Sequence, residues 1–333
     1  MTLVTVFMPA YNAAAYIEES IKSILTQTWT DFEFLIIDDG STDDTVNIIK
    51  RYATTDSRIR FIQNKTNLGL IQSRNLGLTL TTTPLLALLD SDDIAKPNRL
   101  ATQIEFMQAN PSVDICGTFA QCFGDSTHIL TFPLTHDAIK IHLLWGSQLA
   151  NPTVIMRKDL IDNYQLNYTI EPAEDYQFWV DCSQQLTLHN INQPLTDYRR
   201  HDSNLSKTLA CQQAHKKVQQ QQLNQLGLTP SASQLDFHYM LSQQQYLSSQ
   251  SQLHGVSEWF LQLINANNIT AIYEPTLLNY TLAKKFFYYC FYSSRWGLSS
   301  YHEFTKSYLY DHFTPSLKLK IEFYLRCLFK VAK

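Results

Sequence analysis

The stretch Leu85-Leu86-Ala87-Leu88-Leu89-Asp90-Ser91-Asp92-Asp93 decides the fold class. Its apolar run is long enough for one buried strand and too short for a helix, and it stops at three aspartates. In open α/β sheets the carboxyl ends of the strands face the ligand crevice, and carboxylates there suit a hard divalent cation that holds phosphates. The stretch therefore predicts a strand that ends in a cation and diphosphate site. The alternative is an acidic turn that caps the helix expected after Pro97.

Three further strands are predicted upstream, each followed by a helix. Residues 3–8, 32–37 and 58–63 have strand-like composition, and apolar side chains between them recur at helical spacing. The resulting βαβαβαβ pattern predicts an α/β fold with a parallel sheet and right-handed crossovers. The strand ends should then gather Tyr11, Asp39 and residues 90–92 on one edge of the sheet.

The glycine-rich phosphate loops of common nucleotide folds are missing from this sequence. No Gly-x-Gly-x-x-Gly follows the first strand, and no Gly-x-x-x-x-Gly-Lys occurs. We therefore expect a cation and a basic side chain to hold phosphate. Arg74 is the candidate for that side chain, and the alternative is an ordinary surface position on a helix.

Five motifs in this order resemble the family 2 glycosyltransferases of the GT-A fold, which transfer sugars from nucleotide-activated donors and invert the anomeric centre. The resemblance covers roughly residues 2–205. The motifs are Val6 with Pro9-Ala10-Tyr11-Asn12, Asp38-Asp39-Gly40-Ser41-Thr42-Asp43, Asn67-Leu68-Gly69 with Ser73-Arg74-Asn75, Asp90-Ser91-Asp92-Asp93, and Glu174-Asp175.

The resemblance implies a role for each motif in binding the nucleotide. The turn after the first strand and Asp39 would hold a nucleoside, usually uridine, because a carboxylate accepts from the uracil imide and Tyr11 offers a flat face. Asp90 would lie near the ribose. The residues expected to contact the nucleotide are Pro9, Ala10, Tyr11, Asp39, Arg74, Asp90 and Ser91.

The resemblance also implies a metal ion and a general base. Asp92 would bind Mn²⁺ or Mg²⁺ bridging the two phosphates, and His201 would complete the metal shell. Asp175 would be the catalytic base, with its pKa raised in a partly dry cleft beside Glu174. Glu174 would instead orient the acceptor hydroxyl. Taken alone, acidic residues in a first helical turn are ordinary capping residues.

Composition limits the class of protein. The 333 residues carry a formal net charge of −4, which argues against a nucleic-acid partner. The six cysteines form no metal-finger spacing and are expected to be reduced and mostly buried, as in a cytoplasmic protein. We see no export signal and no run of about 18 apolar residues that would span a membrane.

We expect a catalytic domain over residues 1–206 and a helical subdomain over residues 207–333. Within the first, Ser41 or Thr42 should cap a helix, and residues 186–191 and 195–200 should form two separate strands. From Lys284 to Lys333 there are nine Lys or Arg against three acidic residues.

The last predicted helix is basic and amphipathic. Such a helix fits peripheral contact with the anionic inner face of a cytoplasmic membrane, which would bring the protein to a lipid-linked acceptor. The alternative is a face that packs on its own domain or on a second subunit of a homo-oligomer. The apolar side is expected to consist of Leu317, Ile321, Tyr324, Leu325 and Leu328.

The resemblance, together with these residues, implies a metal-dependent inverting glycosyltransferase that moves a hexose or N-acetylhexosamine from a UDP-sugar donor to a glycan or glycolipid acceptor. The expected setting is bacterial surface polysaccharide or lipooligosaccharide synthesis, and the expected product is a β-linkage. A nucleotidyltransferase on a related fold is one alternative, but it needs a glycine-rich basic loop that residues 9–12 do not provide. A non-catalytic scaffold that binds sugar nucleotides is the other.

Overall fold

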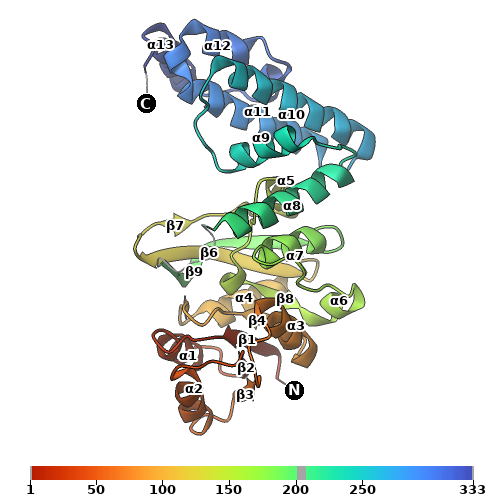
Figure 1. Ribbon diagram of the computed structural model, residues 1–333. Helices are drawn as coiled ribbons and strands as arrows, with labels where there is room; N and C mark the ends of the chain where they lie inside the picture. The colour runs from red at the N-terminus through yellow and green to blue at the C-terminus, as the bar shows by residue number, and fades with distance from the viewer. Residues whose placement is uncertain (1, 201–207, 332–333) are drawn as a thin grey trace. The chain divides into compact units, whose positions relative to one another are not determined.

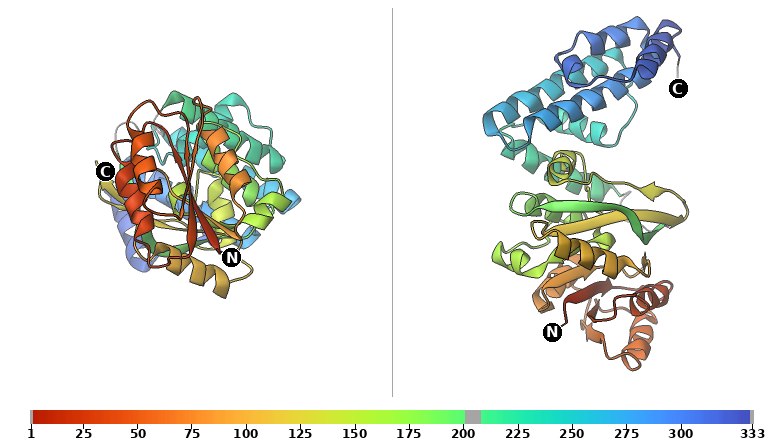
Figure 2. Two further views of the ribbon diagram at one scale, coloured as in Figure 1. Left: turned by 90° about the horizontal axis from the view of Figure 1, so that it is seen from below. Right: turned by 180° about the vertical axis from the view of Figure 1, so that it is seen from behind.

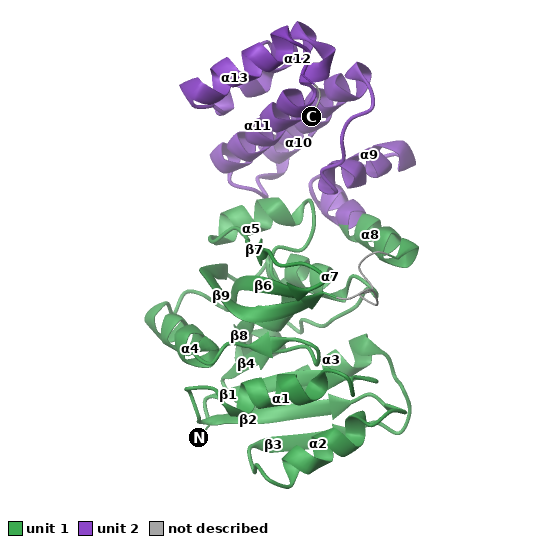
Figure 3. Ribbon diagram, turned by 90° about the vertical axis from the view of Figure 1, so that its left-hand side faces the viewer, with its two compact units in different colours: residues 1–218 green, residues 219–333 purple. Residues whose placement is uncertain are grey.

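The computed structural model describes residues 2–200 and 208–331, and the chain forms two compact units. These are residues 1–218 and residues 219–333 (Figure 3). All six cysteines are free and buried, as predicted.

The first half of unit 1 is the predicted βαβαβαβ arrangement (Figure 1). The four strands are parallel and lie in the order β3-β2-β1-β4, with β1 paired to both β2 and β4. The prediction of a parallel sheet is therefore confirmed. The elements are β1 (Val4–Ala10), α1 (Ile17–Leu25), β2 (Phe32–Asp38), α2 (Thr45–Ala53), β3 (Ile59–Gln63), α3 (Leu70–Leu80) and β4 (Leu85–Leu88).

Both faces of β1, β2 and β4 are covered, which explains why these strands are nearly continuously apolar, whereas the edge strand β3 carries the exposed Arg60 and Gln63. Alternate residues of β1 point to opposite sides, so that Val6 joins a core with α1 and α2 while Phe7 joins a core with α3. Figure 2 shows helices on either side of the strands. On the α3 side, a Cβ on Gly77 would lie 2.4 Å from Cζ of Phe7, so only glycine allows α3 to approach β1 this closely.

The second half of unit 1 extends the same sheet with antiparallel and parallel neighbours, in the order β4-β8-β6-β9-β5, and β7 pairs with β6. Helices and short turns connect these strands. The elements are β5 (Ile94–Ala95), α4 (Arg99–Ala109), β6 (Ile115–Gly124), β7 (Ile129–Leu130), α5 (His136–Leu143), η1 (Asn151–Thr153), β8 (Ile155–Arg157), α6 (Lys158–Asn163), α7 (Glu174–Cys182) and β9 (Leu188–Arg200).

The expectation of two separate late strands was wrong, because β9 runs through both segments as one strand. The polar residues between them do not end the strand. Instead, β6 and β9 pair in parallel with shifts of register around Phe119, which lies opposite Pro194. A bulge of this kind accommodates a proline that a regular ladder would exclude.

Unit 2 is helical, as predicted for this region. Helix α8 spans the boundary between the units, and α10, α11, α12 and α13 surround a cluster of aromatic side chains that includes Phe287 and Phe304. No helix in the described ranges is both long and apolar enough to cross a membrane. The elements are α8 (Leu209–Gln225), α9 (Ala232–Ser242), α10 (Gln250–Thr270), α11 (Pro275–Tyr292), η3 (Ser294–Trp296), α12 (Leu298–Thr305), η4 (Tyr308–His312) and α13 (Leu317–Leu328).

Candidate functional site

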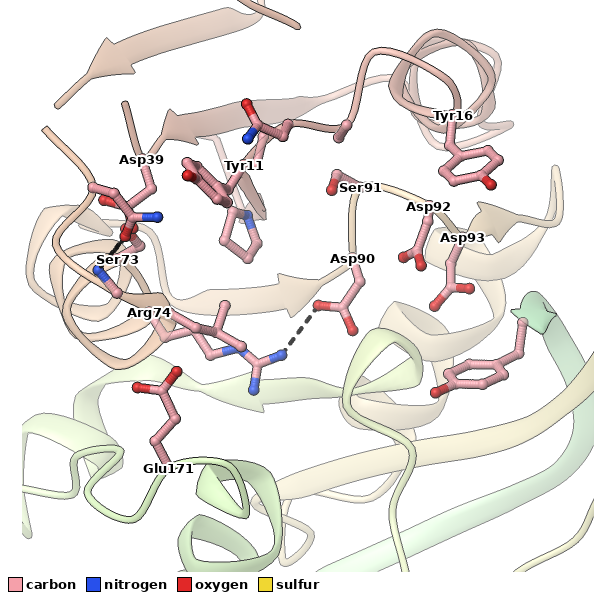
Figure 4. A pocket seen from close by; sticks show the side chains of 18 residues that line it. Tyr11, Tyr16, Asp39, Ser73, Arg74, Asp90, Ser91, Asp92, Asp93 and Glu171 are labelled. Carbon is pink, nitrogen blue, oxygen red and sulfur yellow. Dashed lines mark hydrogen bonds and ion pairs between the residues drawn. The ribbon is translucent and has the colours of Figure 1, made fainter. Parts of the chain in front are cut away.

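A cavity of about 520 Å³ lies at the carboxyl ends of β1, β2 and β4 (Figure 4). Parallel strands bring their ends to one edge, so motifs far apart in the chain meet there. The predicted residues that line this cavity are Pro9, Ala10, Tyr11, Asp39, Arg74, Asp90, Ser91 and Asp92.

The Asp39 carboxylate organises one wall of the cavity. Its oxygens accept hydrogen bonds from the side-chain amide of Asn64 at 2.8 Å and from the backbone N–H groups of Leu68 at 3.0 Å and Gly69 at 2.9 Å. Asp39 is buried, whereas the ring of Tyr11 is about half exposed. The carboxylate therefore fixes the loop before α3, and Tyr11 presents the open aromatic face.

The turn after β1 is tied to the loop after β2. Ser41 Oγ accepts a hydrogen bond from the backbone N–H of Asn12 at 2.9 Å, and Thr45 Oγ1 accepts from Ala13 N–H at 2.8 Å. The prediction that Ser41 or Thr42 caps α2 was wrong, because Asp44 occupies the N-cap position. The hydroxyl of Ser41 instead holds two strand ends together at the cavity.

Arg74 joins three elements at the floor of the site. Its guanidinium is 7% exposed and lies 2.7 Å from Glu174 Oε1 at the start of α7 and 3.3 Å from Asp90 Oδ1 after β4. Burying an arginine is costly unless its charge is compensated, and here two carboxylates provide the compensation. Arg74 is thus already neutralised by two acids, which was not foreseen for a phosphate-binding residue.

Burial shifts the titration of the acids around Arg74. Desolvation raises the pKa of Asp90, of Glu174 and of Asp175, while the positive charge of Arg74 opposes the rise in each case. Asp175 is not among the residues that line the cavity, but it interacts electrostatically with Arg74 and Asp90. The Glu174 and Asp175 pair therefore belongs to the same charged cluster as the strand end.

Asp93 and Arg199 fix the geometry of the acidic loop. The buried Asp93 accepts a hydrogen bond from the backbone N–H of Arg199 at 2.7 Å, and Arg199 Nε donates to the carbonyl of Asp92 at 2.9 Å. Burial, followed by the charges of Asp92 and Asp90, raises the pKa of Asp93 well above its usual range. The end of β9 thus holds the loop that carries Asp92.

Arg99 is a second buried arginine beneath this loop, and sequence reasoning missed it. It donates to the carbonyl of Leu88 at 2.7 Å, and burial lowers its pKa to about 10. Nothing in the sequence pattern distinguishes it from a surface residue of α4. No role was predicted for four other residues that line the cavity, Tyr16, Ser73, Glu171 and Tyr198. Ser73 is part of the motif Ser73-Arg74-Asn75, and Glu171 lies three residues before Glu174.

A divalent cation fits this site only if the ligand supplies part of its coordination. Within residues 2–200 and 208–331, no three His, Cys, Asp or Glu side chains form a metal site by themselves. However, Asp92 lines the cavity beside Asp90, and the buried Oδ2 of Asp93 has no hydrogen-bond partner among the described residues. One or two carboxylates together with phosphate oxygens are the usual ligands of Mg²⁺. The predicted metal ligand His201 lies outside the described residues.

Comparison with known proteins agrees with this geometry. Residues 5–158 match the model described as Glycosyl transferase family 2. An uncharacterized glycosyltransferase of Haemophilus influenzae is 33% identical over 245 residues, which are 68% of this chain and 76% of that protein. The putative teichuronic acid biosynthesis glycosyltransferase TuaG of Bacillus subtilis is 30% identical over 210 residues, 61% of this chain and 81% of TuaG.

Solved structures share the fold. S. aureus TarS 1–349 in complex with UDP-GlcNAc matches with a TM-score of 0.59 and 18% identity, covering 86% of this chain and 89% of that TarS 1–349 chain. At this identity the likeness concerns the fold alone, and it confirms the predicted GT-A architecture. The motifs, the fold and the similarity over about three quarters of the Haemophilus influenzae glycosyltransferase lead to one conclusion: the chain belongs to glycosyl transferase family 2.

Proposed function

We propose that this glycosyltransferase is metal-dependent and inverting, and that it transfers a hexose or N-acetylhexosamine from a UDP-sugar to a glycan acceptor of a bacterial surface polysaccharide or lipooligosaccharide. One observation carries the proposal: Tyr11, Asp39, Asp90 and Asp92 line a single cavity at the strand ends. This cavity offers an aromatic face for a base and carboxylates for a cation-bound diphosphate.

The names of similar proteins support the donor and the setting. TuaG is described as a putative teichuronic acid biosynthesis glycosyltransferase, and TarS holds UDP-GlcNAc. We assign the chemistry to the catalytic domain proposed at residues 1–206. A bound Mn²⁺ or Mg²⁺, held by Asp92 with phosphate oxygens, would offset the negative charge that develops on the departing diphosphate.

Asp175 acts as the general base in this proposal. Its carboxylate removes the proton from the acceptor hydroxyl as the oxygen attacks the anomeric carbon on the face opposite the diphosphate. The bond from carbon to the diphosphate oxygen breaks as the new glycosidic bond forms, so an α-linked donor gives a β-linked product. A raised pKa suits this role, because a base that titrates nearer to neutral pH accepts the proton more readily.

The test measures UDP release from a panel of UDP-sugars with Mn²⁺. We expect Asp175→Asn to bind UDP as the wild type does and to lose turnover by about 10²- to 10⁴-fold, the range for removing a general base. Asp31→Asn is the matched control, because Asp31 is exposed and its side chain lies outside the cavity. Normal turnover by Asp175→Asn would contradict the assignment of the base.

The same assay addresses the scaffold alternative. If the protein only bound sugar nucleotides, calorimetry would show UDP binding, and the release assay would detect no UDP from any pair of donor and acceptor. Asp92→Ala should weaken UDP binding in the presence of Mn²⁺ and leave the weaker binding in its absence nearly unchanged.

A further inference from the structure

Helix α13 attaches to unit 2 through a narrow apolar face. Phe323 and Cys327 are each 1% exposed, and the ring of Phe323 contacts Phe287 at 5.3 Å and Tyr301 at 5.5 Å between centroids. These residues form a core face that already accounts for the attachment of the helix.

A second apolar face of the same helix is largely exposed. We call it the outer face, and it consists of Leu317, Ile321, Tyr324, Leu325 and Leu328, which are 74%, 52%, 43%, 43% and 47% exposed. At about 100° per residue, these five side chains fall within an arc of about 100°. Tyr324 keeps one contact with unit 2, an edge-on approach to the ring of Tyr301 at 5.4 Å between centroids. The buried side chains of the helix are Phe323 and Cys327, so packing on its own domain leaves most of the outer face uncovered.

Lysines border the outer face on both sides. On the same helical projection Lys318 falls just beyond one edge of the arc and Lys320 just beyond the other. Lys318 is exposed and Lys320 is half-buried. Arg326 does not border the outer face, because its guanidinium lies 4.9 Å from the centre of the Phe291 ring in the core. An apolar stripe between two lysines allows the side chains to enter a lipid layer while the ammonium groups remain at the head groups.

We propose that the outer face of α13 binds the surface of a membrane that contains anionic lipid, lying in the plane of the interface. Lys318 and Lys320 beside the outer face favour a negatively charged surface. They belong to a stretch from Lys284 to Lys333 with nine Lys or Arg against three acidic residues, although Lys285 and Arg326 are partly buried within unit 2. A symmetric contact with a second copy is less favourable, because it would bring together two surfaces of the same net positive charge. The proposal is independent of which sugar is transferred.

The experiment is co-sedimentation of the full chain with vesicles of phosphatidylcholine, with and without phosphatidylglycerol. We expect binding to the anionic vesicles, weakened by added salt. The double variant Ile321→Gln with Leu325→Gln should reduce partitioning about tenfold or more, because the apolar area that enters the interface is lost. The matched control makes the same change at two exposed apolar positions of α10, Leu261→Gln with Ile269→Gln, and should bind as the wild type does.

A second pair of variants tests the charge. Lys318→Gln with Lys320→Gln should weaken binding about fivefold for each lysine removed, whereas Lys50→Gln with Lys217→Gln, with the same change in net charge, should have little effect. Circular dichroism checks that each variant is folded. Equal binding by the outer-face and control variants would overturn the proposal. Failure of the wild type to bind anionic vesicles would also overturn it. A dimer in sedimentation velocity that Ile321→Gln with Leu325→Gln abolishes would then assign the outer face to a second copy of the chain.

Discussion

Replacing Arg74 by methionine tests whether its ion pairs hold the candidate site together. The change keeps much of the side-chain length and removes the only positive charge that contacts both Glu174 and Asp90 within the described residues. Because α3, β4 and α7 meet at this guanidinium, its loss leaves two mostly buried carboxylates without a partner.

The expected cost follows from burial. Breaking a buried ion pair by removing one partner costs about 3–5 kcal/mol, and Asp90 is partly exposed, so we expect about 3 kcal/mol of unfolding free energy. Arg60→Met is the matched control. Arg60 pairs with Glu33 at 3.3 Å across two parallel strands, but its side chain is 44% exposed, and such a pair contributes about 0–1 kcal/mol.

The penalty should depend on pH with a definite sign. Burial raises the pKa of Asp90, Glu174 and Asp175 in the folded state, so these groups stabilise the fold when protonated and lose that contribution as pH rises through the folded pKa. Arg74 lowers all three pKa values, so its removal raises them further. More unfolding free energy is then lost as the carboxyl groups ionise with rising pH. The destabilisation by Arg74→Met should therefore be larger at about pH 8 than at about pH 5.

Urea denaturation of both variants at the two pH values measures these differences. A loss for Arg74→Met no greater than that for Arg60→Met would refute the account of the buried network. A penalty that grows as the pH falls would also refute it, because the unpaired carboxylates would then not be the cause.

Three shorter predictions concern the loops around the cavity and the bound metal. Arg199→Met should cost about 1–3 kcal/mol in thermal denaturation and weaken Mn²⁺-dependent UDP binding in calorimetry, since the bond to the carbonyl of Asp92 is lost. Gly40→Ala should lower the free energy of unfolding by at least about 1–3 kcal/mol, because φ is +73° and the new Cβ would lie 2.6 Å from the backbone carbon of Thr66. The control Gly255→Ala in α10 has ordinary contacts and should be neutral or slightly stabilising. Chelation with EDTA should abolish UDP release and added Mn²⁺ should restore it, and undiminished release after chelation would contradict the metal proposal.

The sequence alone determined the first four strands and the edge where the cavity lies. Apolar runs that end in acidic residues specify buried parallel strands, and right-handed crossovers then place their ends together. For this reason Tyr11, Asp39 and Asp92 were assigned to one edge of the sheet, and all three line the cavity. These inferences depend on local periodicity and chain order, which can be read from one sequence.

Tertiary structure alone decided which charges meet. Arg74 and Glu174 are 100 residues apart, and Arg199 reaches Asp92 from the far end of β9, so neither pair leaves a signal at a fixed spacing. The continuity of β9 as one strand likewise depends on a register shift against β6. The exposure of the outer face of α13 depends on which side of the helix packs against the aromatic core. Such contacts result from the distances between elements after folding, and local sequence patterns do not encode those distances.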